Sequence, residues 1–196
     1  MDFGCGSKPY QQLFLGKRYV GVDIAVSGHD HETSQVDVFY DGHTLDIPDE
    51  SFDVVISTEV LEHLFNYDEV LSEIRRVLRP NGKLFITTPF LWAEHEQPYD
   101  YARYTTFGLK ALLEKHGFGQ VCVERRGHVA EGLCQLALTY AISRLTPRPV
   151  IPWRLISFFW CSCFNLSALI GRKILPAYPD VYLSNIATAV KPMSVR

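Results

Sequence analysis

Asp2-Phe3-Gly4-Cys5-Gly6, followed at positions 19–23 by Tyr-Val-Gly-Val-Asp, is the stretch that decides the fold of this 196-residue chain. The first block lies where a strand turns into a helix, and its glycines let a ligand approach the backbone where a Cβ would exclude it. The second block is strand-like and ends in Asp23, the position at which nucleoside-binding folds hold ribose hydroxyls. A glycine turn alone can be purely structural, but the two features in register indicate a nucleoside site.

Strand-like apolar runs alternate with helix-length segments along most of the chain. The clearest helix is expected from Asn66 to Leu78, where apolar residues recur at helical spacing before Pro80-Asn81-Gly82 stops it, and a second from Thr106 to His116. Strands are expected near Tyr19–Ile24, Val36–Phe39, Phe52–Ser57, Gly82–Thr88, Gln120–Arg125 and Tyr182–Val190. This alternation predicts an α/β fold, doubly wound around a mostly parallel sheet.

The overall charge argues against a nucleic-acid partner. The formal net charge is −3 and the isoelectric point is about 6.1, so the chain has no broad basic field. A small or neutral acceptor is therefore expected. Five scattered cysteines do not form a disulfide framework, which favours a reducing cytoplasm.

Four sequence blocks, in order, resemble the class I S-adenosylmethionine-dependent methyltransferases. They are residues 2–10 (DFGCGSKPY), 19–23 (YVGVD), 52–63 (FDVVISTEVLEH) and 77–84 (VLRPNGKL). The resemblance implies a Rossmann-like methyltransferase fold, a single domain over residues 1–196, S-adenosyl-L-methionine as cofactor and methyl transfer as the activity. Family members normally carry a helix and a full first strand ahead of the glycine loop, so we expect this chain to lack that helix and most of that strand.

The same resemblance implies which residues hold the cofactor. Asp2 and the backbone of Gly4 and Gly6 would hold its methionine end, and Asp23 would take both ribose hydroxyls. Asp41-Gly42 matches the position that accepts from the adenine amino group, and Glu59 would lie beside the methionine moiety. The spacing of Glu59, Glu62 and His63 suggests one helical face, but the inverted zinc motif requires a histidine where Glu59 stands, so no metal is predicted.

The segment from Thr88 to Tyr104 follows a strand and combines aromatic residues with His, carboxylates and Arg. Such a loop lies at the edge where open α/β sheets bind ligands. His95 is the first choice for a general base, because an unperturbed imidazole titrates near neutral pH. Asp100, Arg103 and Tyr104 are expected to orient the acceptor. In the alternative reading the tyrosines only pack, and Arg103 pairs with Asp100 to fix the loop.

An aromatic-rich apolar insertion at about 149–176 interrupts the α/β pattern. Residues 155–171 are uncharged and flanked by Arg154, Arg172 and Lys173. Because the strand that follows must return to the sheet, we do not expect a membrane span; a buried helix and an interfacial helix remain open. The favoured function is methyl transfer to a small-molecule or glycan/lipid-linked acceptor in the cytoplasm, with peripheral contact at the inner face of the membrane as an extension. The alternatives are a protein or nucleic-acid methyltransferase and a degenerate, non-catalytic membrane-associated scaffold; the oligomeric state is not predicted.

Overall fold

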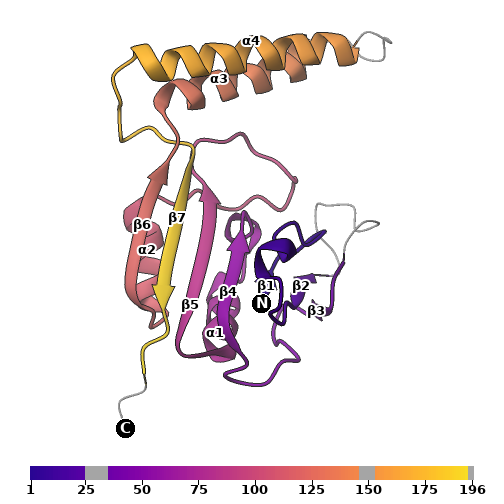
Figure 1. The fold of residues 1–196 in the computed structure, drawn as a ribbon, viewed down its shortest axis with the longest axis vertical. Coiled ribbons are helices and arrows are strands. Elements are labelled where there is room, and N and C mark those ends of the chain that lie inside the picture. Colours follow the sequence, from indigo (N-terminus) through magenta and orange to yellow (C-terminus); the bar gives the residue numbers. More distant parts are fainter. Residues whose placement is uncertain (25–34, 146–152, 194–196) are drawn as a thin grey trace. The chain divides into compact units, whose positions relative to one another are not determined.

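A seven-stranded sheet in the order β3-β2-β1-β4-β5-β7-β6 organises the chain in the computed structural model, which describes residues 1–24, 35–145 and 153–193 (Figure 1). The strands are β1 (Asp2–Phe3), β2 (Gly21–Ile24), β3 (Val38–Tyr40), β4 (Phe52–Thr58), β5 (Leu78–Pro89), β6 (Gly119–Arg126) and β7 (Ser184–Val190). The helices are η1 (Gln11–Phe14), η3 (Leu61–His63), α1 (Tyr67–Val77), α2 (Thr106–Lys115), α3 (Val129–Tyr140), the π-helical η4 (Ala141–Leu145) and α4 (Trp153–Ile174). All six strands expected from the sequence are present.

The central strands are parallel, and β7 runs against them. β1 lies between β2 and β4, with Asp2 paired with Gly21 on one side and Ile56 on the other. β7 is antiparallel to β5, because the Asn81 and Lys191 N–H groups donate to the Lys191 and Gly82 carbonyls respectively. The predicted Rossmann-like, mostly parallel fold is confirmed, and β1 is as short as expected.

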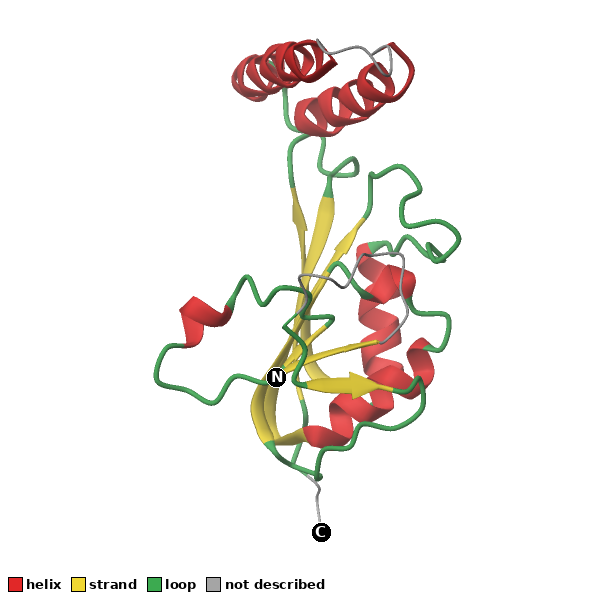
Figure 2. Cartoon of the chain, turned by 90° about the vertical axis from the view of Figure 1, so that its right-hand side faces the viewer, coloured by secondary structure: helices red, strands yellow, loops and turns green. Residues whose placement is uncertain are grey.

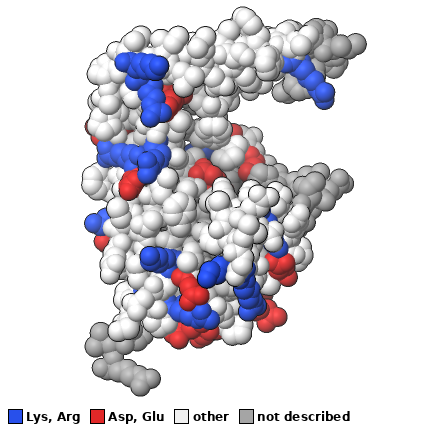
Figure 3. Space-filling model, in the orientation of Figure 1, with Lys and Arg blue, Asp and Glu red and all other residues white. Residues whose placement is uncertain are grey.

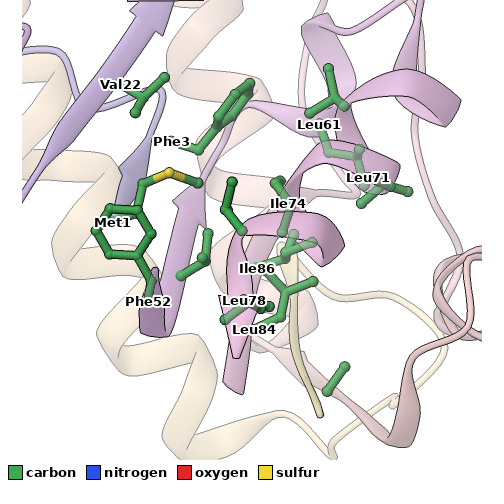
Figure 4. Close-up of a cluster of buried hydrophobic side chains, with 14 of the residues drawn as sticks. Met1, Phe3, Val22, Phe52, Leu61, Leu71, Ile74, Leu78, Leu84 and Ile86 are labelled. Carbon is green, nitrogen blue, oxygen red and sulfur yellow. The ribbon is translucent and has the colours of Figure 1, made fainter. Parts of the chain in front are cut away.

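Helices α1 and α2 cover one face of the sheet (Figure 2). Val70, Leu71, Ile74 and Val77 of α1 are all buried, which is the result of their three- and four-residue spacing. They meet Val55 of β4 and other inward residues of the strands in one apolar cluster, part of which Figure 4 shows with Phe3, Val22, Leu84 and Ile86. This core holds the strand ends, and the loops that follow them, in place.

The chain divides into two compact units. The first comprises residues 1–89, 94–124 and 185–196, and the second comprises residues 90–93 and 125–184. In the second unit α3 packs against α4. Helix α3 was not predicted; it begins at a capping box in which His128 accepts from the Ala130 N–H while the Glu131 carboxylate accepts from the His128 N–H. Of the expected insertion, residues 149–152 lie outside the described residues.

Candidate functional site

A cavity of about 340 Å³ opens at the carboxyl ends of β1, β2 and β4, within the first unit. Open α/β sheets bind ligands at this edge, where the strand order changes direction. Its lining consists of Phe3, Gly4, Gly6, Asp23, Ile24, Thr58, Glu59, Val60, His63, Leu64, His95 and Glu96. Five residues predicted from the sequence, Gly4, Gly6, Asp23, Glu59 and His95, therefore line one cavity.

The glycine loop reaches the end of β2 through its backbone. Gly4 and Gly6 have φ values of 76° and 46°, in the left-handed region that glycine adopts without strain. The Gly4 N–H donates to the Val22 carbonyl at 2.8 Å, and the Gly6 N–H donates to Asp23 Oδ2 at 2.9 Å. A Cβ added at Gly6 would meet no atom within 4 Å, so the backbone there faces open space. The loop is thus fixed while its surface stays accessible.

Asp2 lies behind this loop and does not line the cavity. Its side chain is buried, and its Oδ2 accepts from the Tyr19 hydroxyl, whereas Oδ1 has no partner among the described residues. Burial raises the pKa of this carboxyl above its usual range. The predicted role of Asp2 in holding the cofactor stays a prediction.

Asp41 and Gly42 follow β3 and also lie outside the cavity lining. One oxygen of Asp41 accepts from the N–H groups of His43 and Thr44, both at 2.8 Å, and these bonds lower the pKa of the carboxyl. The Gly42 carbonyl accepts from the side chain of Asn66. In this arrangement Asp41 stabilises its own turn, and its predicted contact with adenine stays a prediction.

His95 stands on the other side of the cavity, on the segment after β5. Its Nδ1 lies 3.2 Å from Asp100 Oδ2, an electrostatic contact whose angle does not meet hydrogen-bond geometry, and its backbone N–H donates to the same oxygen at 3.0 Å. Arg103 holds Asp100 with two bonds, at 2.5 and 2.7 Å, and lowers the pKa of this carboxyl to about 2. Asp100 is therefore ionised beside His95 at neutral pH.

Asp100, Arg103 and Tyr104 do not themselves line the cavity. The Asp100–Arg103 pair fixes the loop, as the alternative reading of the sequence proposed. Tyr104 packs against the apolar cluster, and burial raises the pKa of its hydroxyl to about 12. Its carbonyl accepts from Asn185 at 2.7 Å, which ties the loop to β7. Their expected contact with the acceptor stays a prediction.

Sequence reasoning gave no firm role to His63 and none to Glu96, both of which line the cavity, or to Glu62, which is buried next to His63. The proposed common helical face of Glu59, Glu62 and His63 is wrong, because only the short η3 forms and Glu59 precedes it with a φ of 54°. Glu62 is fully buried, and both of its carboxylate oxygens lack a hydrogen-bond partner among the described residues. Burial raises the pKa of Glu62 to about 8.

His63 contacts three neighbouring residues at the cavity. His63 donates its Nδ1 proton to the Tyr99 carbonyl at 2.8 Å, because a carbonyl can only accept, and its Nε2 lies 3.5 Å from Glu96 Oε1. The ring of His63 meets that of His95 edge-on, with centroids 4.7 Å apart. Glu62, His63 and His95 each bring one ligand atom within 4.8 Å of the others, so this group could hold a metal ion. That the site takes no metal stays a prediction.

The chain is similar to known methyltransferases. A methyltransferase-domain family model matches residues 1–86, which include the glycine loop, Asp23 and Glu59. A probable S-adenosylmethionine-dependent methyltransferase of Mycolicibacterium smegmatis is 33% identical over 95 residues, covering 45% of this chain and 37% of that protein. A ubiquinone biosynthesis O-methyltransferase of Rhodopseudomonas palustris is 28% identical over 153 residues, covering 66% of this chain and 60% of that protein. The chain thus spans about a third to three fifths of the length of these relatives.

Among solved structures, phosphoethanolamine N-methyltransferase 2 of Haemonchus contortus in complex with S-adenosyl-L-methionine has a similar fold. The TM-score is 0.61 at 19% sequence identity, and the match covers 98% of this chain and 48% of that one. At this identity the likeness shows the fold alone.

Proposed function

Because the chain belongs to the class I S-adenosylmethionine-dependent methyltransferases, we propose that it transfers a methyl group from S-adenosyl-L-methionine to a small-molecule acceptor. One observation carries the proposal: a single cavity joins the glycine loop, the acid that ends β2 and the histidine beyond β5. A nucleoside-binding edge and a candidate base therefore face the same space.

The residues present fit the cofactor. The open backbone at Gly6 leaves room for a close ligand, and Asp23 offers carboxylate oxygens at the end of β2. We infer that Gly4, Gly6 and Glu59 hold the methionine end and that Asp23 accepts from the ribose hydroxyls. When bound, the cofactor supplies an electrophilic methyl group. The chain holds the acceptor in line with this methyl group, and this orientation accounts for most of the rate acceleration of an in-line transfer.

His95 is proposed as the base that receives the proton of the acceptor. The ionised Asp100 beside Nδ1 favours the tautomer that carries its proton there, so Nε2 keeps a lone pair. Arg103 positions Asp100 and thereby the imidazole ring. Asp100 and Arg103 are positioning residues in this proposal, because neither lines the cavity.

A small acceptor is supported by the absence of excess positive charge in the sequence, which disfavours a nucleic-acid substrate. Two relatives are named for small-molecule chemistry: ubiquinone biosynthesis for one, and malonyl-[acyl-carrier protein] for an O-methyltransferase of Yersinia pestis. A glycan or lipid-linked acceptor is the finer proposal, favoured by the exposed apolar side chains of α4.

Calorimetric titration of S-adenosyl-L-methionine into the full chain tests the proposal. Saturable one-site binding is expected. Asp23→Ala is expected to weaken binding by more than ~1.5 kcal/mol, since two hydroxyls lose a charged acceptor. Asp53→Ala is the matched control, because Asp53 is an exposed carboxylate near the opposite end of β4 and pairs with Arg79. No binding by the unmodified chain would refute the function, and equal losses in both variants would remove Asp23 from the site.

A further inference from the structure

The second unit presents an apolar surface whose chemistry the methyl-transfer site does not use. Helix α4 packs along α3 in a hairpin, and the close approach is made at Gly171, where an added Cβ would lie 2.8 Å from the Cβ of Ala130 (Figure 1). Arg172 of α4 pairs with Glu131 of α3 at 3.1 Å. The end of α4 therefore lies beside the beginning of α3, and the two helices are antiparallel.

The opposite side of α4 is exposed and apolar. Seven large side chains of this helix are each at least 50% exposed: Leu155, Phe158, Phe159, Leu166, Leu169, Ile170 and Ile174. Most are three, four or seven residues apart, so they form one stripe along the helix. Contiguous apolar surface of this kind marks an interaction site in soluble proteins. We call these seven residues the α4 stripe.

Basic residues flank the α4 stripe at its two ends, although one of them, Arg172, is paired with Glu131. Helix α4 contains no Asp or Glu, and Arg154 lies near its start with Arg172 and Lys173 near its end. Residues 125–184 contain seven Lys or Arg and two Asp or Glu, whereas the rest of the chain contains twelve and twenty. Figure 3 shows basic side chains near both ends of the hairpin, with uncharged surface between them. The charge of this unit is thus opposite in sign to that of the rest.

This pattern matches an anionic lipid surface better than a second copy of the chain. Two α4 helices packed face to face would bring basic ends together whether they are parallel or antiparallel. Helix α4 has no Asp or Glu that could offset this repulsion between like charges. Interfacial helices combine an apolar face with flanking Lys and Arg that attract anionic headgroups.

Chain topology decides between lying on the bilayer and crossing it. By length and composition α4 could cross a membrane, since residues 154–174 are apolar enough and little buried. However, β6 precedes the hairpin and β7 follows it, and these strands are neighbours in one sheet, so a single crossing is excluded. Among the described residues α4 is the one helix long and apolar enough to cross a membrane, so they offer no second helix for a return span.

We propose that the α3–α4 hairpin docks peripherally on an anionic bilayer, with the α4 stripe inserted at the level of the headgroups and outer acyl chains. Of the two readings that the sequence left open, this proposal adopts the interfacial helix. No residue of the α4 stripe lines the cavity, so vesicle binding can be tested separately from cofactor binding.

Flotation of the full chain with vesicles tests this proposal. We expect binding to equimolar phosphatidylcholine and phosphatidylglycerol, little binding to phosphatidylcholine alone, and release by high salt. Phe158→Asp with Phe159→Asp is expected to lower partitioning at least ~10-fold. Phe107→Asp is the matched control, because Phe107 is an equally exposed aromatic residue on α2 of the first unit, and it is expected to bind like the unmodified chain.

Circular dichroism of each variant verifies that it is folded, and Phe158→Ser with Phe159→Ser replaces the Asp pair if that pair unfolds. Three results of the vesicle experiments would overturn the proposal. They are absence of vesicle binding at low salt, equal loss in the Phe107 control, and resistance of bound chain to alkaline carbonate, which would mean a span. A concentration-dependent dimer without lipid that the α4 substitutions abolish would assign the stripe to a second copy instead.

Discussion

Replacing Glu62 with Gln is expected to remove a large loss of folding stability that the unmodified chain undergoes as the pH rises from 4.5 to 8. Glu62 is fully buried, both of its carboxylate oxygens lack a hydrogen-bond partner among the described residues, and His63 Nε2 lies 3.8 Å from Oε1. Burial raises its pKa from 4.5 to about 8. The folded state therefore holds the proton more tightly than the unfolded state, and the stabilisation is fully present below pH 4.5 and is lost as the pH rises to 8.

The size of this change in unfolding free energy follows from the difference between the pKa of Glu62 in the unfolded state, 4.5, and in the folded state, about 8. At about 1.4 kcal/mol per pH unit, the loss of unfolding free energy between pH 4.5 and 8 amounts to about 5 kcal/mol. Gln is close in volume to protonated Glu and does not titrate. The Glu62→Gln variant is therefore expected to match the unmodified chain near pH 4.5 and to exceed it progressively toward pH 8.

Urea unfolding at a series of pH values, followed by far-ultraviolet circular dichroism, measures this difference. Glu114→Gln is the control, because Glu114 is a half-exposed carboxylate on α2 that pairs with Lys110. That variant is expected to follow the unmodified chain at every pH. A constant difference between Glu62→Gln and the unmodified chain from pH 5 to 8 would refute the assignment of a buried, proton-holding carboxyl.

Two further predictions concern the base and the glycine loop. His95→Ala is expected to lower the rate of methyl transfer ~10²-fold while cofactor affinity stays within about twofold, as initial rates with methyl-labelled cofactor and calorimetry would show. Equal losses in the rate and in the cofactor affinity would mean that His95 supports the fold or the cofactor site and is not the base. Gly4→Ala is expected to cost about 1–3 kcal/mol more in unfolding free energy than Gly16→Ala. Both glycines have φ near 76°, but only at Gly4 would the new Cβ clash with a neighbour, the Cγ2 of Val60. Similar costs in denaturant melts would contradict the proposed clash.

Much of the candidate site could be predicted because its signals are local. A glycine loop and a strand-ending acid occur in fixed order along the chain, and parallel strands bring their carboxyl ends to one edge of the sheet. Gly4, Gly6, Asp23, Glu59 and His95 accordingly line one cavity. Asp41 had an equally local signal; its carboxylate also accepts from the N–H groups of the following turn, and its contact with adenine stays a prediction.

Residues whose role depends on burial could not be identified in advance. Glu62 and Glu96 are ordinary acids in the sequence, and only the folding of η3 against the segment after β5 brings them together with His63. Burial removes water from Glu62 and so changes its protonation, an effect that no spacing rule encodes.

Hydrophobic periodicity and loop chemistry sufficed for the α/β class, the strand positions and the helix α1, because each of these depends on neighbours within a few residues. Three features depend on contacts between distant segments: the direction of β7, the pairing of Asp100 with His95, and the side of α4 that is exposed in the described part of the chain. The apolar run at 155–171 is compatible with a buried or an exposed helix, since composition alone does not say what packs against it. Only the antiparallel packing of α3 on one side of α4 shows which of its residues remain exposed.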